Sequence, residues 1–162
     1  MRLTRRSLSL AVGCAAVLLV AACAGPGGKR RVSEPAASVQ QLSVLADGRW
    51  EVSVRLNNFS NVPMQFASLD LRIALDGTEA ATVQAQPGIA IGPESADVVK
   101  VTASPTPQAR ARIATALADG RSVSYRLDGE VRAGPEQSGP RSYAIKRDSA
   151  LAPVPGLPGV LR

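Results

Sequence analysis

The body of the chain alternates apolar and polar side chains in separate short blocks. In WEVSVRLN, residues 50–57, every second residue is apolar, and LDLRIALD, residues 69–76, repeats the pattern. A third block spans residues 123–131. Such alternation is typical of strands with one buried and one solvent-facing side, which occur in antiparallel sheets. These blocks therefore constrain the chain to fold as packed β-sheets.

Weaker blocks raise the expected number of strands to about seven. They occupy residues 39–45, 81–84, 98–103 and 142–146. The pairs Asp47-Gly48 and Asp76-Gly77 lie between neighbouring blocks, where a tight hairpin requires positive φ. We therefore predict an all-β fold, a two-sheet antiparallel sandwich of the fibronectin or immunoglobulin type, over residues 38–147.

One segment, residues 104–120, departs from the alternation and predicts a helix. Thr106 is placed to cap it, Pro107 takes the first helical position, and Gly120 ends it. Its apolar residues recur at every fourth position, at Ala109, Ile113 and Leu117. We expect a short amphipathic helix that closes one end of the sandwich before the penultimate strand.

The N-terminal segment has the composition of an export signal. Residues 1–6, MRLTRR, carry a positive charge. The apolar run at residues 8–22 is shorter than the roughly 20 residues that span a bilayer. A charged start, a short apolar run and small residues at its end are typical of a cleaved signal. We therefore predict a signal peptide over residues 1–22.

Residues 20–23, VAAC, resemble the lipobox of bacterial lipoproteins. In that family the cysteine becomes the first residue of the mature protein and carries a thioether-linked diacylglycerol. The resemblance implies lipid attachment at Cys23, and Ala24 behind it implies delivery to the outer membrane, facing the periplasm. The alternative is an ordinary cleaved signal with an incidental cysteine.

Two further stretches, residues 23–37 and 148–162, flank the predicted sandwich. Glycine and proline are frequent in the first, so we expect a lipidated N terminus followed by a flexible tether. Within it, Lys29, Arg30 and Arg31 would contact anionic lipid head groups, or would be ordinary solvated linker residues. The second stretch is rich in proline and glycine and is expected to form an extended or disordered tail, whose apolar residues a partner groove could bind.

The composition argues against an enzyme. Histidine is absent, and with it the commonest general base and metal ligand. Lys100 alternates with valines, which places it on the solvent-facing side of a strand. Asp70, Asp76 and Glu79 lie around one hairpin, where solvent-facing turn residues are favoured over a calcium site. We predict no catalytic residues, no cofactor and no metal.

The net charge carries little information about partners. It is +6 for the whole chain and falls to +3 beyond Cys23, because three of the 19 basic residues and none of the 13 acidic ones precede that position. The remaining basic residues are not interleaved with aromatic side chains, which make up 3% of the chain. We therefore expect no nucleic-acid binding.

The order of these features resembles a known family. Residues 52–83, VSVRLNNFSNVPMQFASLDLRIALDGTEAATV, combine a strand, an asparagine-rich turn with a proline, and a strand that ends in an Asp-Gly turn. The loop GIAIGPES, residues 88–95, precedes the next strand. The arrangement is similar to the water-stress and hypersensitive-response domain of the type 2 late embryogenesis abundant family, over residues 38–146. The resemblance implies a non-catalytic, fibronectin-like sandwich associated with desiccation, whose bacterial members are often lipoproteins.

Two functional hypotheses follow from these observations. The first is a lipid-anchored protein that protects envelope proteins or membranes during water loss by binding many of them weakly. The second is an accessory to envelope assembly or transport that docks one partner through a sheet edge or through the C-terminal tail. The expected partners are the membrane, through the lipid anchor, and either protein clients or one envelope complex.

Overall fold

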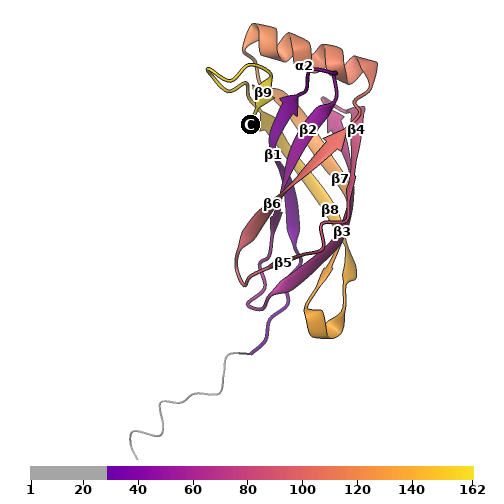
Figure 1. Ribbon diagram of the computed structural model, residues 1–162, viewed down its shortest axis with the longest axis vertical. Helices are drawn as coiled ribbons and strands as arrows, with labels where there is room; N and C mark the ends of the chain where they lie inside the picture. Colours follow the sequence, from indigo (N-terminus) through magenta and orange to yellow (C-terminus); the bar gives the residue numbers. More distant parts are fainter. Residues whose placement is uncertain (1–28) are drawn as a thin grey trace, which may run out of the picture. The chain divides into compact units, whose positions relative to one another are not determined.

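The computed structural model describes residues 29–162, of which Arg31–Arg162 form one compact unit (Figure 1). This unit consists of two antiparallel sheets and one α-helix, so the predicted all-β sandwich is confirmed. Nine strands are present in this part of the chain, because two short strands add to the seven that alternation predicts. Within the described residues, no helix has the length and apolar character needed to cross a membrane.

The first sheet contains four strands and the second contains five. The order in the first sheet is β6 (Ala96–Ala103), β2 (Trp50–Asn57), β1 (Ala36–Val44) and β9 (Val160–Leu161). The order in the second sheet is β4 (Thr78–Ala85), β3 (Met64–Leu75), β7 (Val123–Gly134) and β8 (Arg141–Leu151), with β5 (Ile89–Ile91) also paired to β3. The alternating blocks of the sequence therefore form the central strands, β2, β3 and β7.

Both predicted Asp-Gly hairpins are confirmed. The first joins β1 to β2, and Gly48 has a φ of 81°. The second joins β3 to β4, and both of its central residues have positive φ, 46° at Asp76 and 84° at Gly77. Positive φ at both positions matches the twist of the flanking strands, which is why Asp-Gly pairs favour this turn.

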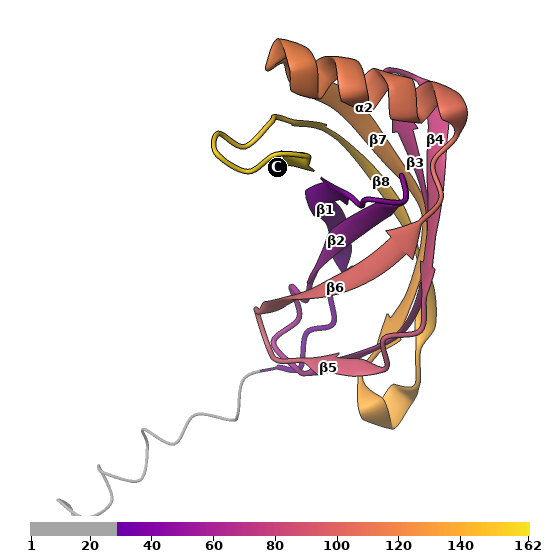
Figure 2. The ribbon, with the colours of Figure 1, turned by 45° about the horizontal axis from the view of Figure 1, so that its top comes forward.

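The helix α2 (Pro107–Asp119) forms where the sequence predicts it and lies across one end of the sandwich (Figure 2). Thr106 caps it by accepting a hydrogen bond from the Ala109 backbone N–H at 3.2 Å, and Gly120 ends it with a left-handed φ of 65°. The buried residues of α2 are Ala109, Ile113 and Ala116. The helix precedes β7, and three strands follow it. The sequence predicts two strands after the helix, because β9 has no local signal.

The core between the sheets is mostly aliphatic, with three buried aromatic side chains. Trp50 and Phe66 are at most 1% exposed, and Tyr125 is 3% exposed. The Tyr125 hydroxyl reaches the other sheet, where it accepts a hydrogen bond from the Val39 backbone N–H at 3.2 Å. Trp50 and Tyr125 therefore act as packing anchors of the core.

The C-terminal residues 148–162, expected to be an extended or disordered tail, pair with the sandwich through extended residues of β8 and β9. β8 continues to Leu151, and Leu161 pairs with Leu42 of β1. Leu151 and Leu161 are at most 1% exposed, so burial of these side chains holds the segment in place. The prolines and glycines lie in the loop between the two strands, which turns the chain back toward the first sheet.

Candidate functional site: the Asn58 junction

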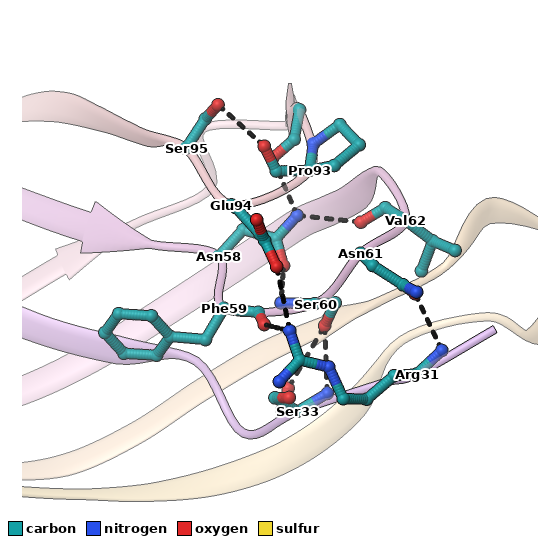
Figure 3. A network of polar contacts seen from close by, with 11 residues as sticks. Arg31, Ser33, Asn58, Phe59, Ser60, Asn61, Val62, Pro93, Glu94 and Ser95 are labelled. Atoms are coloured by element: carbon teal, nitrogen blue, oxygen red, sulfur yellow. Dashed lines mark hydrogen bonds and ion pairs between the residues drawn. The ribbon is translucent and has the colours of Figure 1, made fainter. Parts of the chain in front are cut away.

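Three segments meet at the end of the sandwich away from α2, where the chain first joins the fold (Figures 1 and 3). They are residues 31–33, the loop 58–63 between β2 and β3, and the loop 92–95 between β5 and β6. We call this arrangement the Asn58 junction. It contains the asparagine-rich turn and part of the GIAIGPES loop, two of the features that carry the family resemblance.

The side chain of Asn58 joins the two loops of the junction. It is 1% exposed, and its Nδ2 donates to the carbonyl oxygens of Val62 and Gly92, each at 2.8 Å, and of Ile91 at 3.1 Å. Its Oδ1 accepts a hydrogen bond from the Ser60 backbone N–H at 2.9 Å. Every polar atom of this buried amide therefore has a protein partner, and the amide ties the loop 58–63 to the backbone of residues 91 and 92.

Ser60 connects the junction to the N-terminal segment. Its side chain is fully buried, and its Oγ accepts a hydrogen bond from the Ser33 backbone N–H at 3.0 Å. The same Oγ lies 3.3 Å from the Ser33 carbonyl oxygen, to which it donates. The Ser60 carbonyl oxygen also accepts from the Glu94 backbone N–H at 3.0 Å. Ser60 thus holds the segment that precedes β1 through its hydroxyl and the loop 92–95 through its backbone carbonyl.

Arg31 is fixed to the junction by its backbone and by its guanidinium. Its backbone N–H donates to Asn61 Oδ1 at 2.7 Å, and its carbonyl oxygen accepts from the Asn61 backbone N–H at 3.2 Å. Its Nη2 pairs with Glu94 Oε1 at 2.9 Å, where both side chains are more than half exposed. An exposed ion pair of this kind contributes at most about 1 kcal/mol, so the buried bonds around Ser60 hold the segment more strongly.

The junction also presents apolar side chains to solvent. Phe59 is 52% exposed, and its ring points away from the polar network in Figure 3. Val32, between the two anchored residues Arg31 and Ser33, is 46% exposed. The described residues contain two other exposed large hydrophobic side chains, Val44 at 37% and Leu157 at 47%. The hydrogen-bonded loops therefore hold an exposed aromatic ring on a rigid support.

The structure tests only part of the predicted site. Cys23 lies outside the described residues, so lipid attachment stays a prediction. Lys29 and Arg30 precede the compact unit, and their contact with lipid head groups also stays a prediction. Arg31 belongs to the folded unit, and β1 begins at Ala36, so the chain joins the fold earlier than the predicted tether boundary at residue 37. The sequence of the basic run is typical of a linker, because nothing in the local sequence indicates the hydrogen bonds that Arg31 makes with distant residues.

The charged residues considered for catalysis or metal binding do not converge. Lys100 pairs with Glu51 at 3.2 Å on an exposed surface. Asp70 accepts a hydrogen bond from Gln84, and Asp76 accepts one from Arg112 at 2.6 Å. Among residues 29–162, no three acidic, cysteine or histidine side chains are grouped so that they could hold a metal ion.

Among the described residues, the two side chains with a shifted pKa belong to exposed ion pairs. In the first hairpin, the Arg49 backbone N–H and then the Arg49 side chain donate to Asp47 and lower the pKa of that carboxyl. The Asp148 carboxylate, with its hydrogen bond and charge, raises the pKa of Arg126. Both pairs are exposed, so the shifts stabilise ionised groups on the surface.

The fold and the junction define a class of protein, a small two-sheet sandwich whose loops are organised by a buried asparagine. The family model for late embryogenesis abundant protein, LEA_2, matches residues 53–140, and the chain belongs to this family. The family comprises stress-related β-sandwich domains and is generally non-enzymatic. The matched residues include both loops that Asn58 joins.

Solved structures with similar folds show low sequence identity to the chain. A crystal structure of a protein from Archaeoglobus fulgidus is 16% identical, with a TM-score of 0.46, over 76% of this chain and 98% of that chain. A solution structure of a protein from Arabidopsis thaliana is 12% identical, with a TM-score of 0.49, over 80% of this chain and 84% of that chain. The search of curated protein sequences found no match. The family assignment therefore rests on the match of the family model.

Proposed function

We propose that the chain is a lipid-anchored envelope protein whose sandwich protects proteins or membranes during water loss, through weak and non-catalytic binding. The observation that carries this proposal is the family match over residues 53–140, which covers most of the sandwich. The lipobox-like VAAC and the following Ala24 support attachment at Cys23 and an outer-membrane location facing the periplasm. The family match supports the role in stress, and the N-terminal sequence supports the proposed location.

The surface of the sandwich is consistent with weak binding of many clients. Its solvent-facing side chains carry mixed charges that pair with one another, such as Lys100 with Glu51 and Arg126 with Asp148. A surface of this kind remains hydrated and soluble at high concentration. A protectant needs both properties as water is withdrawn, because it must stay dispersed between its clients.

The first experiment measures protection directly. Residues 24–162, expressed without the signal segment, are dried together with a drying-sensitive enzyme, and the recovered enzyme activity is compared with that after drying with an equal mass of serum albumin. We expect a higher recovery with the sandwich. A recovery no better than with albumin would contradict the protective function, while the fold and the family would stand.

The second experiment tests the anchor. Mass spectrometry of the protein extracted from membranes is expected to find an N-terminal peptide that begins at Cys23 and carries acyl mass. The Cys23→Ser variant is the matched control and should be recovered without acyl mass. A wild-type mature protein that begins at another residue, or that lacks acyl mass, would contradict lipid anchoring.

A second candidate function, an accessory that docks one envelope partner, is favoured by one feature. An apolar groove of about 620 Å³ lies between the C-terminal end of α2 and the loop 153–159, and its lining includes Leu117 and the 47% exposed Leu157. Crosslinking in the native envelope separates the two functions. An accessory should give one dominant crosslinked partner that Leu157→Ser removes, whereas a protectant should give many weak partners that this change leaves in place.

A further inference from the structure

The exposed aromatic ring of the Asn58 junction is unusual within this chain. The chain contains two phenylalanines, and Phe66 is fully buried whereas Phe59 is 52% exposed. Removing the apolar area of an exposed phenylalanine ring from water is favourable, so a partner that covers the ring gains free energy. Val32, 46% exposed in the segment bonded to the same loop, adds a second apolar side chain to this end of the sandwich.

The junction holds Phe59 on a backbone with little freedom to move. Asn58, its neighbour on one side, makes four hydrogen bonds through its buried side chain. Ser60, its neighbour on the other side, is fully buried and bonded to Ser33. The Phe59 carbonyl oxygen accepts from Arg31 Nη2 at 3.3 Å. A rigid support lowers the conformational entropy that binding through this ring would cost.

The position of the ring along the chain indicates what covers it. Arg31, bonded to the Phe59 carbonyl, lies eight residues after Cys23. Eight residues span at most about 28 Å even when fully extended. A lipid on Cys23 therefore keeps the junction within that distance of the bilayer surface, where the effective concentration of lipid is high. The loop that carries Leu157 is at the other end of β2, about 26 Å farther along that strand.

We propose that the Asn58 junction docks on the bilayer that holds the Cys23 lipid, with the Phe59 ring and the Val32 side chain inserted among the lipid head groups and upper acyl chains. This inference rests on the proposed lipid anchoring and extends it from a loose tether to an oriented domain. The end with α2 and the groove beside Leu157 then points into the periplasm. Docking needs little intrinsic affinity, because the lipid and the apolar side chains act together as two signals.

The test uses the full lipidated protein, reconstituted in vesicles of phosphatidylethanolamine and phosphatidylglycerol with added phosphatidylcholine. The phosphatidylcholine is either unlabelled or brominated in its upper acyl chains, where bromine quenches nearby tryptophan fluorescence. Two variants, Phe59→Trp and Leu157→Trp, place a tryptophan at two positions of similar exposure, 52% and 47%, at opposite ends of the sandwich. The wild-type protein, whose Trp50 is 1% exposed, measures the background.

We expect brominated lipid to reduce the emission of Phe59→Trp and to leave the emission of Leu157→Trp and of the wild type unchanged. The quenching should persist in high salt, because insertion of an aromatic ring is apolar and salt screens only charges. Quenching that disappears in high salt would assign the contact to basic residues and overturn the insertion of Phe59. Equal quenching at both positions, or none at either, in a protein that floats with the vesicles would also overturn docking and leave the anchor intact.

The anchor is checked on the same samples. Acyl mass on Cys23 and flotation with the vesicles are measured before fluorescence. A protein without acyl mass that does not float would contradict both the proposed anchoring and the docking that rests on it. A protein with both properties but without selective quenching would contradict docking alone.

Discussion

The side-chain amide of Asn58 donates a hydrogen bond to the carbonyl oxygen of Gly92 at 2.8 Å and so joins two loops that lie 34 residues apart in the sequence. The same amide accepts from Ser60, whose hydroxyl holds Ser33. The end of the sandwich that receives the N-terminal segment is therefore organised around two buried polar side chains, those of Asn58 and Ser60. The orientation that we propose for the domain on the membrane depends on this organisation.

Replacing Asn58 with alanine is expected to lower the free energy of unfolding by about 2–4 kcal/mol. The change leaves three carbonyl oxygens and one backbone N–H without their partner in a buried place, and each such group carries a desolvation cost. Urea unfolding followed by circular dichroism measures the loss. Asn57→Ala is the matched control, because the Asn57 side chain accepts an exposed hydrogen bond from Arg55, and its effect should stay within about 0.5 kcal/mol. Equal losses in the two variants would contradict the central role of Asn58.

Replacing Ser60 with alanine should release the N-terminal segment more than it destabilises the sandwich. The hydroxyl that bonds both backbone groups of Ser33 is lost, at about 1 kcal/mol. Trypsin cleavage after Arg31 should therefore become faster, because the protease needs a locally opened chain. Ser95→Ala is the control, since the Ser95 hydroxyl bonds only the nearby Pro93 carbonyl. An unchanged cleavage rate in Ser60→Ala would mean that other contacts hold the segment.

The sequence predicts the seven longer strands and misses the two shortest, β5 and β9. β2 and β3 expose one side to solvent, so their period of two is visible, and the Asp-Gly turns between strands have a local chemistry that predicts them. β9 has two residues, and its partner Leu42 lies far away in the sequence, so nothing local marks it as a strand. The prolines and glycines before it resemble those of disordered segments, although here they form a turn.

The candidate site was predictable only in part for the same reason. The asparagines of residues 57–61 predict a turn, because asparagine bonds its own backbone in turns. Asn58 does so with Ser60 and Val62, but its bonds to Ile91 and Gly92 come from a loop that the fold brings close. The fixed position of Arg31 likewise depends on Asn61 and Glu94. Long-range polar contacts of this kind leave no periodic pattern in a sequence.

Gly129, in the middle of β7, should not tolerate a side chain. Its φ is 149°, and a Cβ at this position would overlap the carbonyl oxygen of Asp70 and lie 2.9 Å from the Leu71 Cα on the neighbouring strand β3. Gly129→Ala is therefore expected to lower the free energy of unfolding by more than about 2 kcal/mol, because two central strands must separate. In Gly77→Ala, the control, the added Cβ meets no atom within 4 Å, so only the cost of a positive φ of 84° applies, about 1 kcal/mol. A smaller loss at Gly129 than at Gly77 would show that β3 and β7 can shift apart at little cost.

Leu161 tests whether the C-terminal residues are part of the fold or a detachable tail. Its side chain is fully buried and its backbone pairs with β1, so Leu161→Ala is expected to lower the free energy of unfolding by about 2–4 kcal/mol. Leu157→Ala, four residues earlier and 47% exposed, should change it by no more than about 0.5 kcal/mol. Thermal unfolding of both variants measures the difference.

Deleting the whole segment would unfold the domain, so loss of binding after a deletion could not be assigned to loss of a binding site. A partner-binding role for this end of the protein must therefore be tested by substituting exposed residues such as Leu157. If Leu161→Ala is as stable as Leu157→Ala, β9 is detachable and the tail can again be considered as a free binding segment.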